Sequence, residues 1–272
     1  MTWRSHCIDI WTQMQESRLY NKRYVALLAS ISALAILAPI VEHGFWARML
    51  VGSMMFVALW TGSVAVSTKG NVSGWSVALA TLASFLWAVG FFAESLPVNA
   101  VYLHYLTYSV LLLFFGNVGR LMLEDILQGE VNFNRICGGV CVFILLGLCF
   151  SMLHMIVAAG DPKAYRDNFD PSANFGDSLS HEYRYPVFVY FSFCTLSTVG
   201  YGDIVPVSRL ARSCAMMESV TGQLYLAILV ARLVGLHIAT THKNQSSSEV
   251  IEAIETETTE NRRKRLEATL RK

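Results

Sequence analysis

The chain has 272 residues and a formal net charge of +1, with 54% hydrophobic but only 15% charged residues. Soluble domains carry about 25% charged residues, so this composition indicates an integral membrane protein. The basic residues are scattered or confined to the C-terminal tail, which gives no support to nucleic-acid binding. No catalytic constellation occurs in the sequence, and we therefore expect no enzyme activity, no small-molecule substrate and no organic cofactor.

Six apolar runs are long enough to cross a bilayer, which takes about 20 residues of α-helix. They lie at about 24–41, 46–66, 74–93, 98–119, 136–159 and 213–239. The first run is longer than the apolar core of a secretory signal, roughly 7–15 residues, so we interpret it as a membrane span. The sequence thus predicts an all-α integral membrane protein with six transmembrane helices per subunit.

The basic residues predict the orientation of these spans. Four of them occur within residues 1–23, and a cluster at 262–265 follows the last span. We expect the protein to lie in the inner membrane of the cell. By the positive-inside rule, both of its termini should be in the cytoplasm. Residues 1–23 would form a cytoplasmic N-terminal segment and 241–272 a cytoplasmic tail, too short for a nucleotide-binding domain of ordinary size.

The first four spans, within residues 24–123, lack the charges of a voltage-sensing domain. The fourth span contains neither arginine nor lysine, and the second contains no acidic residue. Each elementary charge moved across the membrane contributes about 2.3 kcal/mol per 100 mV, so a sensor needs several of them. We expect this region to have little or no voltage dependence.

The second half of the chain begins with the fifth span and continues into a polar loop at 160–185. The loop has five acidic and three basic residues, which would raise the local cation concentration, although a simple solvated loop explains it equally well. Pro186 suits the first turn of a helix, and Val187–Ser197 is predicted as a short helix after it.

That short helix leads into the most informative motif of the chain, Thr-Leu-Ser-Thr-Val-Gly-Tyr-Gly-Asp at 195–203. Successive backbone carbonyls point the same way only where right- and left-handed residues alternate. Gly200 and Gly202 permit this, because glycine adopts a positive φ without a steric penalty. Rings of such carbonyls replace the hydration shell of a potassium ion.

The motif resembles the selectivity filter of the tetrameric potassium channels. The order of outer helix, extracellular loop, pore helix, filter and inner helix over 136–240 is that of the family's pore domain. The resemblance implies a four-fold ring of identical subunits, with a short pore helix and a filter loop in each. It implies that K⁺ is bound by Thr198, Val199, Gly200 and Tyr201, with Gly202 completing the filter.

Further residues are assigned to filter support by their positions in this pattern. Tyr190 and Phe191 lie where related channels carry aromatic side chains that brace the filter, with generic apolar packing as the alternative. Cys194 replaces a carboxylate that in some relatives pairs with the aspartate after the filter. Asp203 is therefore expected to lack a partner on the pore helix. Thr195 lies shortly before the filter and, like Asp203, is a further candidate for filter support.

Glu218 is an ionisable residue inside a span and hence a candidate functional residue. It is expected either to bond behind the filter, with Thr195 as a possible partner, or to anchor one helix to another. Gly222 lies where many relatives have a hinge glycine, with close helix contact as the alternative. Three histidines are candidate pH-responsive groups, or else structural: His104, His154 and His181.

Taken as a whole, the chain resembles a prokaryotic six-span potassium channel with a two-helix pore module and a degenerate voltage-sensor-like region. The resemblance implies passive, potassium-selective conduction through a homotetramer embedded in membrane lipids, with K⁺ ions in the filter. Two alternatives stay open: a non-selective cation channel, and a non-conducting, channel-like membrane subunit. The sequence does not indicate which stimulus opens the channel, or whether the inner helix is open or closed at rest.

Overall fold

The computed structural model describes residues 23–37, 45–66, 74–93, 100–128, 133–168, 181–232 and 234–235. The chain divides into a unit that ends at Leu226 and a second unit that starts at Ala227. The contacts discussed below lie within the first unit. Of the predicted cytoplasmic segments, residues 1–23 and 241–272, all but Arg23 lie outside the described residues.

The first three helices are α2 (Arg23–Leu37), α3 (Phe45–Ala65) and α4 (Gly74–Ala93), close to the predicted runs. Their side chains are largely apolar, and several of their serine and threonine hydroxyls bond to carbonyls of their own helices. The Ser63 hydroxyl, for example, donates to the Leu59 carbonyl at 3.0 Å. A helix that satisfies its own polar groups in this way suits a lipid environment.

Helix α5 (Ala100–Gln128) extends nine residues beyond the predicted end of the fourth run at 119. Its last turns are polar, and hydropathy therefore did not predict them. An ion pair between Arg120 and Glu124, at 2.6 Å and one turn apart, supports the helix there. Asp125 in the same segment accepts hydrogen bonds from the side chains of Arg23 (2.8 Å) and Tyr24, which tie this end of α5 to α2.

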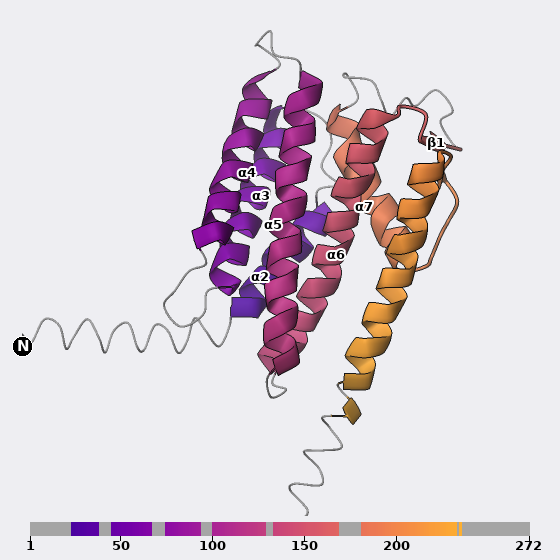
Figure 1. The fold of residues 1–272 in the computed structure, drawn as a ribbon. Helices are drawn as coiled ribbons and strands as arrows, with labels where there is room; N and C mark the ends of the chain where they lie inside the picture. Colours follow the sequence, from indigo (N-terminus) through magenta and orange to yellow (C-terminus); the bar gives the residue numbers. More distant parts are fainter. Residues whose placement is uncertain are drawn as a thin grey trace, which may run out of the picture. The chain divides into compact units, whose positions relative to one another are not determined.

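Helix α6 (Phe133–Gly160) packs against α2, α5 and α7, and lies beside α5 and α7 in Figure 1. Glycine allows the close approach: a Cβ on Gly138 would lie 3.0 Å from the Tyr24 ring and 3.2 Å from Ile126. The Cys141 thiol donates to the Tyr24 carbonyl at 3.4 Å. Helix α6 therefore joins the first four helices to the region that contains the filter motif.

Two short strands flank the filter region, and the sequence did not predict them. Strand β1 (Tyr165–Asp167) pairs antiparallel with β2 (Ile204–Pro206), with Tyr165 opposite Pro206 and Asp167 opposite Ile204. Each strand has three residues, which is too short for an alternating pattern to be recognised. The first part of the polar loop after α6 is thus hydrogen-bonded, through β1, to the residues directly after the filter motif.

Helix α7 (His181–Leu196) begins six residues before the predicted short helix and ends one residue before its predicted end at Ser197. The placement of Pro186 at the start of the helix was wrong, since Pro186 lies inside α7. Proline lacks the N–H that would bond the carbonyl four residues before it. In α7 that carbonyl belongs to Glu182 in the first turn of the helix, so only one hydrogen bond near the helix end is lost.

The last described helix, Arg209–Arg232, starts four residues before the predicted inner span. The Ser208 hydroxyl accepts a hydrogen bond from the Ala211 N–H at 3.2 Å, as an N-cap residue does. Within the part of the chain that the structure describes, this helix and α6 are the two long and apolar enough to span a membrane. The count of six spans stays a prediction.

Candidate functional site

The filter motif begins where α7 ends, and its first amides bond back to that helix. The Thr198 N–H donates to the Thr195 carbonyl at 3.0 Å, and the N–H groups of Val199 and Gly200 donate to the Cys194 carbonyl at 2.9 and 3.3 Å. In a trans peptide the N–H and C=O groups point in opposite directions. The carbonyls of Thr198 and Val199 therefore point away from α7.

Left-handed residues alternate through the motif, as expected for the two glycines. Gly200 has a φ of 56° and Gly202 a φ of 77°. Thr198 has a φ of 59°, which the sequence did not predict, because non-glycine residues rarely adopt this conformation. The two-residue period of the glycines, extended back by one step, was the signal that could have identified Thr198.

Asp203, the last residue of the filter motif, has a partner on α7 after all. The Tyr190 hydroxyl donates to Asp203 Oδ2 at 2.6 Å, and the Ile204 N–H donates to Oδ1 at 2.9 Å. The bond to Asp203 raises the pKa of the Tyr190 phenol. The Tyr190 ring also lies parallel to the Tyr201 ring, with centroids 6.5 Å apart. A phenol thus takes the place of the missing carboxyl at Cys194.

Phe191, the second predicted bracing residue, packs on another face of α7 from Tyr190. Its ring meets the rings of His154 and Tyr165 edge to face, at centroid distances of 5.0 and 5.6 Å. Of the two aromatic residues, Tyr190 contacts the filter and Phe191 packs against α6 and β1. The packing interpretation suits Phe191 better than a direct contact with the filter.

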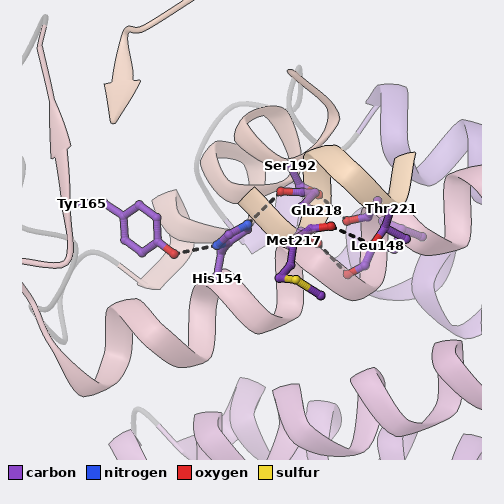
Figure 2. A network of polar contacts seen from close by, with 9 residues as sticks. Leu148, His154, Tyr165, Ser192, Met217, Glu218 and Thr221 are labelled. Carbon is purple, nitrogen blue, oxygen red and sulfur yellow. Dashed lines mark hydrogen bonds and ion pairs between the residues drawn. The ribbon is translucent and has the colours of Figure 1, made fainter. Parts of the chain in front are cut away.

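Glu218 lies in a buried network that joins four elements (Figure 2). Its Oε2 is 2.9 Å from His154 Nε2 on α6, and its Oε1 accepts a hydrogen bond from Ser192 on α7. His154 Nδ1 lies 2.6 Å from the Tyr165 hydroxyl on β1. Burial raises the pKa of the Tyr165 phenol, which stays protonated. Every polar atom of this chain of contacts has a partner, as a buried network requires.

The network answers the question that the sequence left open about Glu218. The hydrogen bonds found for its carboxyl group lead to His154 and Ser192, and not to Thr195. The Ser192 hydroxyl is also 2.7 Å from the Gly147 carbonyl on α6. This geometry favours the interpretation of Glu218 as an anchor between helices. His154 was expected to be either pH-responsive or structural, and its buried contact with Glu218, which nothing in the sequence indicates, favours the structural alternative.

Gly222 lies where the inner helix touches the end of the pore helix. A Cβ at this position would be 2.3 Å from the Leu196 carbonyl oxygen. Nearby, Gln223 Nε2 is 3.4 Å from the Thr198 hydroxyl, a long hydrogen bond. The 2.3 Å approach to the Leu196 carbonyl fits the alternative interpretation of Gly222, a close contact between helices. It does not test whether the inner helix bends at Gly222.

The comparison with protein families bears on this same region. Residues 140–237 match the model of a family described as "Ion channel". These residues are thus similar to an ion channel domain. The match supports the resemblance to the potassium channel superfamily, and together with the apolar helices it makes the chain a membrane protein.

One curated relative is similar over part of the chain. Protein LctB of Geobacillus stearothermophilus is 35% identical over 91 residues, which are 34% of this chain. The matched part covers 62% of LctB, so the chain spans less than two thirds of that relative.

Proposed function

We propose that the protein is a potassium-selective channel that conducts K⁺ passively down its electrochemical gradient. The observation that carries the proposal is the alternation of left-handed residues at Thr198, Gly200 and Gly202. With the amides of the motif tied to the end of α7, successive carbonyls are free to face an ion on the other side. The ligands would be the oxygens of Thr198, Val199, Gly200 and Tyr201, with Gly202 at the outer end.

The pore would be a homotetramer, since one chain supplies one filter segment and carbonyls from several sides must surround the ion. Two features of the single chain support this assembly. The side chains of Val199 and Tyr201 are exposed. Most of the apolar side chains on the inner helix are exposed as well, whereas more than half of the residues in the apolar stretch of α6 are buried. Neighbouring subunits and membrane lipids would cover these surfaces.

Asp203, Tyr190 and Thr195 would hold the filter, and Glu218 would fix the inner helix behind it. Phe191 would support the filter indirectly through α6 and β1. Gly222 would let the inner helix approach the end of α7, and it is also the candidate gating hinge. Residues 24–123 would form a scaffold without an arginine ladder, so opening would depend little on voltage. Both termini would lie in the cytoplasm.

Recording from the purified protein in planar bilayers, with unequal KCl concentrations on the two sides and NaCl added to balance the ionic strength, tests the proposal. A reversal potential near the equilibrium value for potassium is expected, with an open probability that changes little with voltage. A reversal potential near zero would instead identify a non-selective cation channel. An intact tetramer that never conducts, with or without lipids of varied headgroup, would favour the non-conducting subunit.

A further inference from the structure

Asn168 lies at the end of β1 and contacts the outer end of the filter, a contact that the proposed function does not use. Its side-chain Nδ2 donates to the Gly202 carbonyl at 2.7 Å. Its backbone N–H donates to the Asp203 carbonyl at 2.8 Å. One residue from the loop after α6 therefore holds two successive carbonyls where the filter ends.

The orientation of the Asn168 amide follows from its two neighbours. The Arg166 Nε–H donates to Asn168 Oδ1 at 3.1 Å, and the guanidinium group can only donate. The Gly202 carbonyl can only accept, so the NH₂ group of Asn168 must face it. The cationic Arg166 group also polarises the amide, which strengthens the second hydrogen bond in the chain.

The position of Asn168 is fixed by the strand that carries it. Strand β1 pairs with β2, which starts directly after Asp203. Three residues before Asn168, the Tyr165 hydroxyl bonds His154 of the buried network. The donor that holds Gly202 is thus mounted on an element anchored to α6. Gly202, in contrast, has a φ of 77° and open space where a Cβ would lie, so its own surroundings restrain it little.

We propose that Asn168 is a positioning residue for the outermost carbonyl ring of the filter, an inference that rests on the proposed potassium channel function. A carbonyl oxygen has two lone pairs, so Gly202 can accept from Asn168 and still face an ion. The hydrogen bond fixes the direction of this carbonyl in each subunit. Without it, the peptide after Gly202 rotates more freely, and the outer ring loses its geometry between ion passages.

The test is single-channel recording of Asn168→Asp and Asn168→Ala in planar bilayers at low and high external K⁺. The first variant keeps the size of the side chain but has no donor, and the second adds no charge. Both should shorten the mean open time about fivefold, the effect expected when one hydrogen bond is lost. High external K⁺ should restore it, because an ion among the four Gly202 carbonyls attracts the same oxygens.

Arg166→Gln and Lys163→Gln form a matched pair for the role of Arg166. Each removes one positive charge from the same loop, but only Arg166 contacts Asn168. Arg166→Gln should shorten the open time, and Lys163→Gln should leave it unchanged. A general loss of structure would shorten open times equally at all K⁺ concentrations.

Open times like those of the wild type in both Asn168 variants, or shortened open times that external K⁺ does not restore, would contradict the role of Asn168. A wild-type protein without potassium selectivity would instead contradict the proposed function. If Asn168→Asp does not assemble into a tetramer on a sizing column, Asn168→Ala, which keeps the backbone contact to Asp203, decides the question.

Discussion

His154 Nε2 lies 2.9 Å from Glu218 Oε2, although the two residues are 64 positions apart and both are fully buried. The contact joins α6 to the inner helix, and Ser192 extends it to the pore helix. Removing one member of a buried polar pair leaves the other unsatisfied, which destabilises far more than loss of an exposed pair. The buried group of His154, Ser192 and Glu218 therefore holds α6, α7 and the helix Arg209–Arg232 together beside the filter motif.

Glu218→Leu should strongly destabilise the assembled protein, whereas Glu218→Gln should be tolerated. Leucine leaves the buried His154 Nε2–H without an acceptor, at about 1–3 kcal/mol for an unsatisfied group, while the Ser192 hydroxyl keeps only its bond to the Gly147 carbonyl. Glutamine offers one acceptor to the His154 N–H and one donor to the Ser192 hydroxyl, which can still donate to the Gly147 carbonyl. The temperature at which the tetramer dissociates in detergent measures both effects.

Met217→Leu is the matched control, since Met217 is exposed in the chain, lies next to Glu218 and keeps its volume in this exchange. It should change the dissociation temperature little. Equal losses of stability in Glu218→Gln and Glu218→Leu would show that glutamine cannot replace the carboxyl group, and would contradict the hydrogen bonds assigned to Glu218.

Tyr190→Phe should shorten the openings of the channel about tenfold while the potassium selectivity of those openings persists. The substitution removes the hydroxyl that donates to Asp203 but keeps the ring beside Tyr201. Hydrogen bonds to charged groups contribute about 1.5–3 kcal/mol, which sets the size of the effect. Single-channel records before and after the exchange provide the measurement.

Tyr185→Phe on the same helix serves as the control for Tyr190→Phe. The Tyr185 hydroxyl is buried, and within the described residues it has no hydrogen-bond partner. Its removal should leave open times unchanged and should not reduce stability. Equal effects of the two exchanges would mean that the bond between Tyr190 and Asp203 does not hold the filter.

The sequence predicts best those features that depend on neighbouring residues. The positive φ of Gly200 and Gly202 follows from a five-residue motif, and the apolar runs gave the helices to within a few residues. The polar end of α5 was missed because it depends on an ion pair and not on hydropathy. The short strand β1 was missed because three residues give no period.

The partners of Asp203 and Glu218 could not be read from the sequence for a different reason. Position 194 holds a cysteine and no carboxyl group, but the Tyr190 hydroxyl, one turn earlier, donates to the Asp203 carboxylate. His154 and Glu218 meet only because α6 and the inner helix pack side by side at one height, which two apolar helices do not specify. Long-range polar pairs of this kind require the structure.

Gly200→Ala should abolish selective conduction while the subunits still assemble. An L-residue with a side chain at a φ of 56° is strained by roughly 1–2 kcal/mol, and relief of that strain turns the neighbouring carbonyls. Gly116→Ala in α5 is the control, because a Cβ there meets nothing within 4 Å and alanine favours the helix. Reversal potentials between KCl and NaCl compare the variants, and an unchanged value for Gly200→Ala would contradict the proposed filter conformation.

The two close-packed glycines near the pore helix should respond differently to a compensating exchange. A Cβ on Gly147 would lie 2.8 Å from the Phe193 ring, whereas a Cβ on Gly222 would lie 2.3 Å from the Leu196 carbonyl, a backbone atom. Trimming the Phe193 side chain relieves the first contact, whereas trimming Leu196 removes only the lesser contacts of its Cδ1 and Cγ at 3.0 and 3.1 Å and leaves the carbonyl in place. Phe193→Ala should therefore offset more of the destabilisation by Gly147→Ala than Leu196→Ala offsets of that by Gly222→Ala.

Two double-mutant cycles on the dissociation temperature of the tetramer measure this difference. Residues in contact typically couple by about 0.5–3 kcal/mol, so a favourable coupling of this size is expected between Gly147 and Phe193. The coupling between Gly222 and Leu196 should be clearly smaller, because the carbonyl oxygen at 2.3 Å is present in every variant and only the side-chain contacts at 3.0 and 3.1 Å are removed. A coupling as large as that between Gly147 and Phe193 would mean that the Leu196 side chain, and not its carbonyl, limits the space at Gly222. The inner helix would then be less closely packed against the start of the filter than the 2.3 Å approach requires.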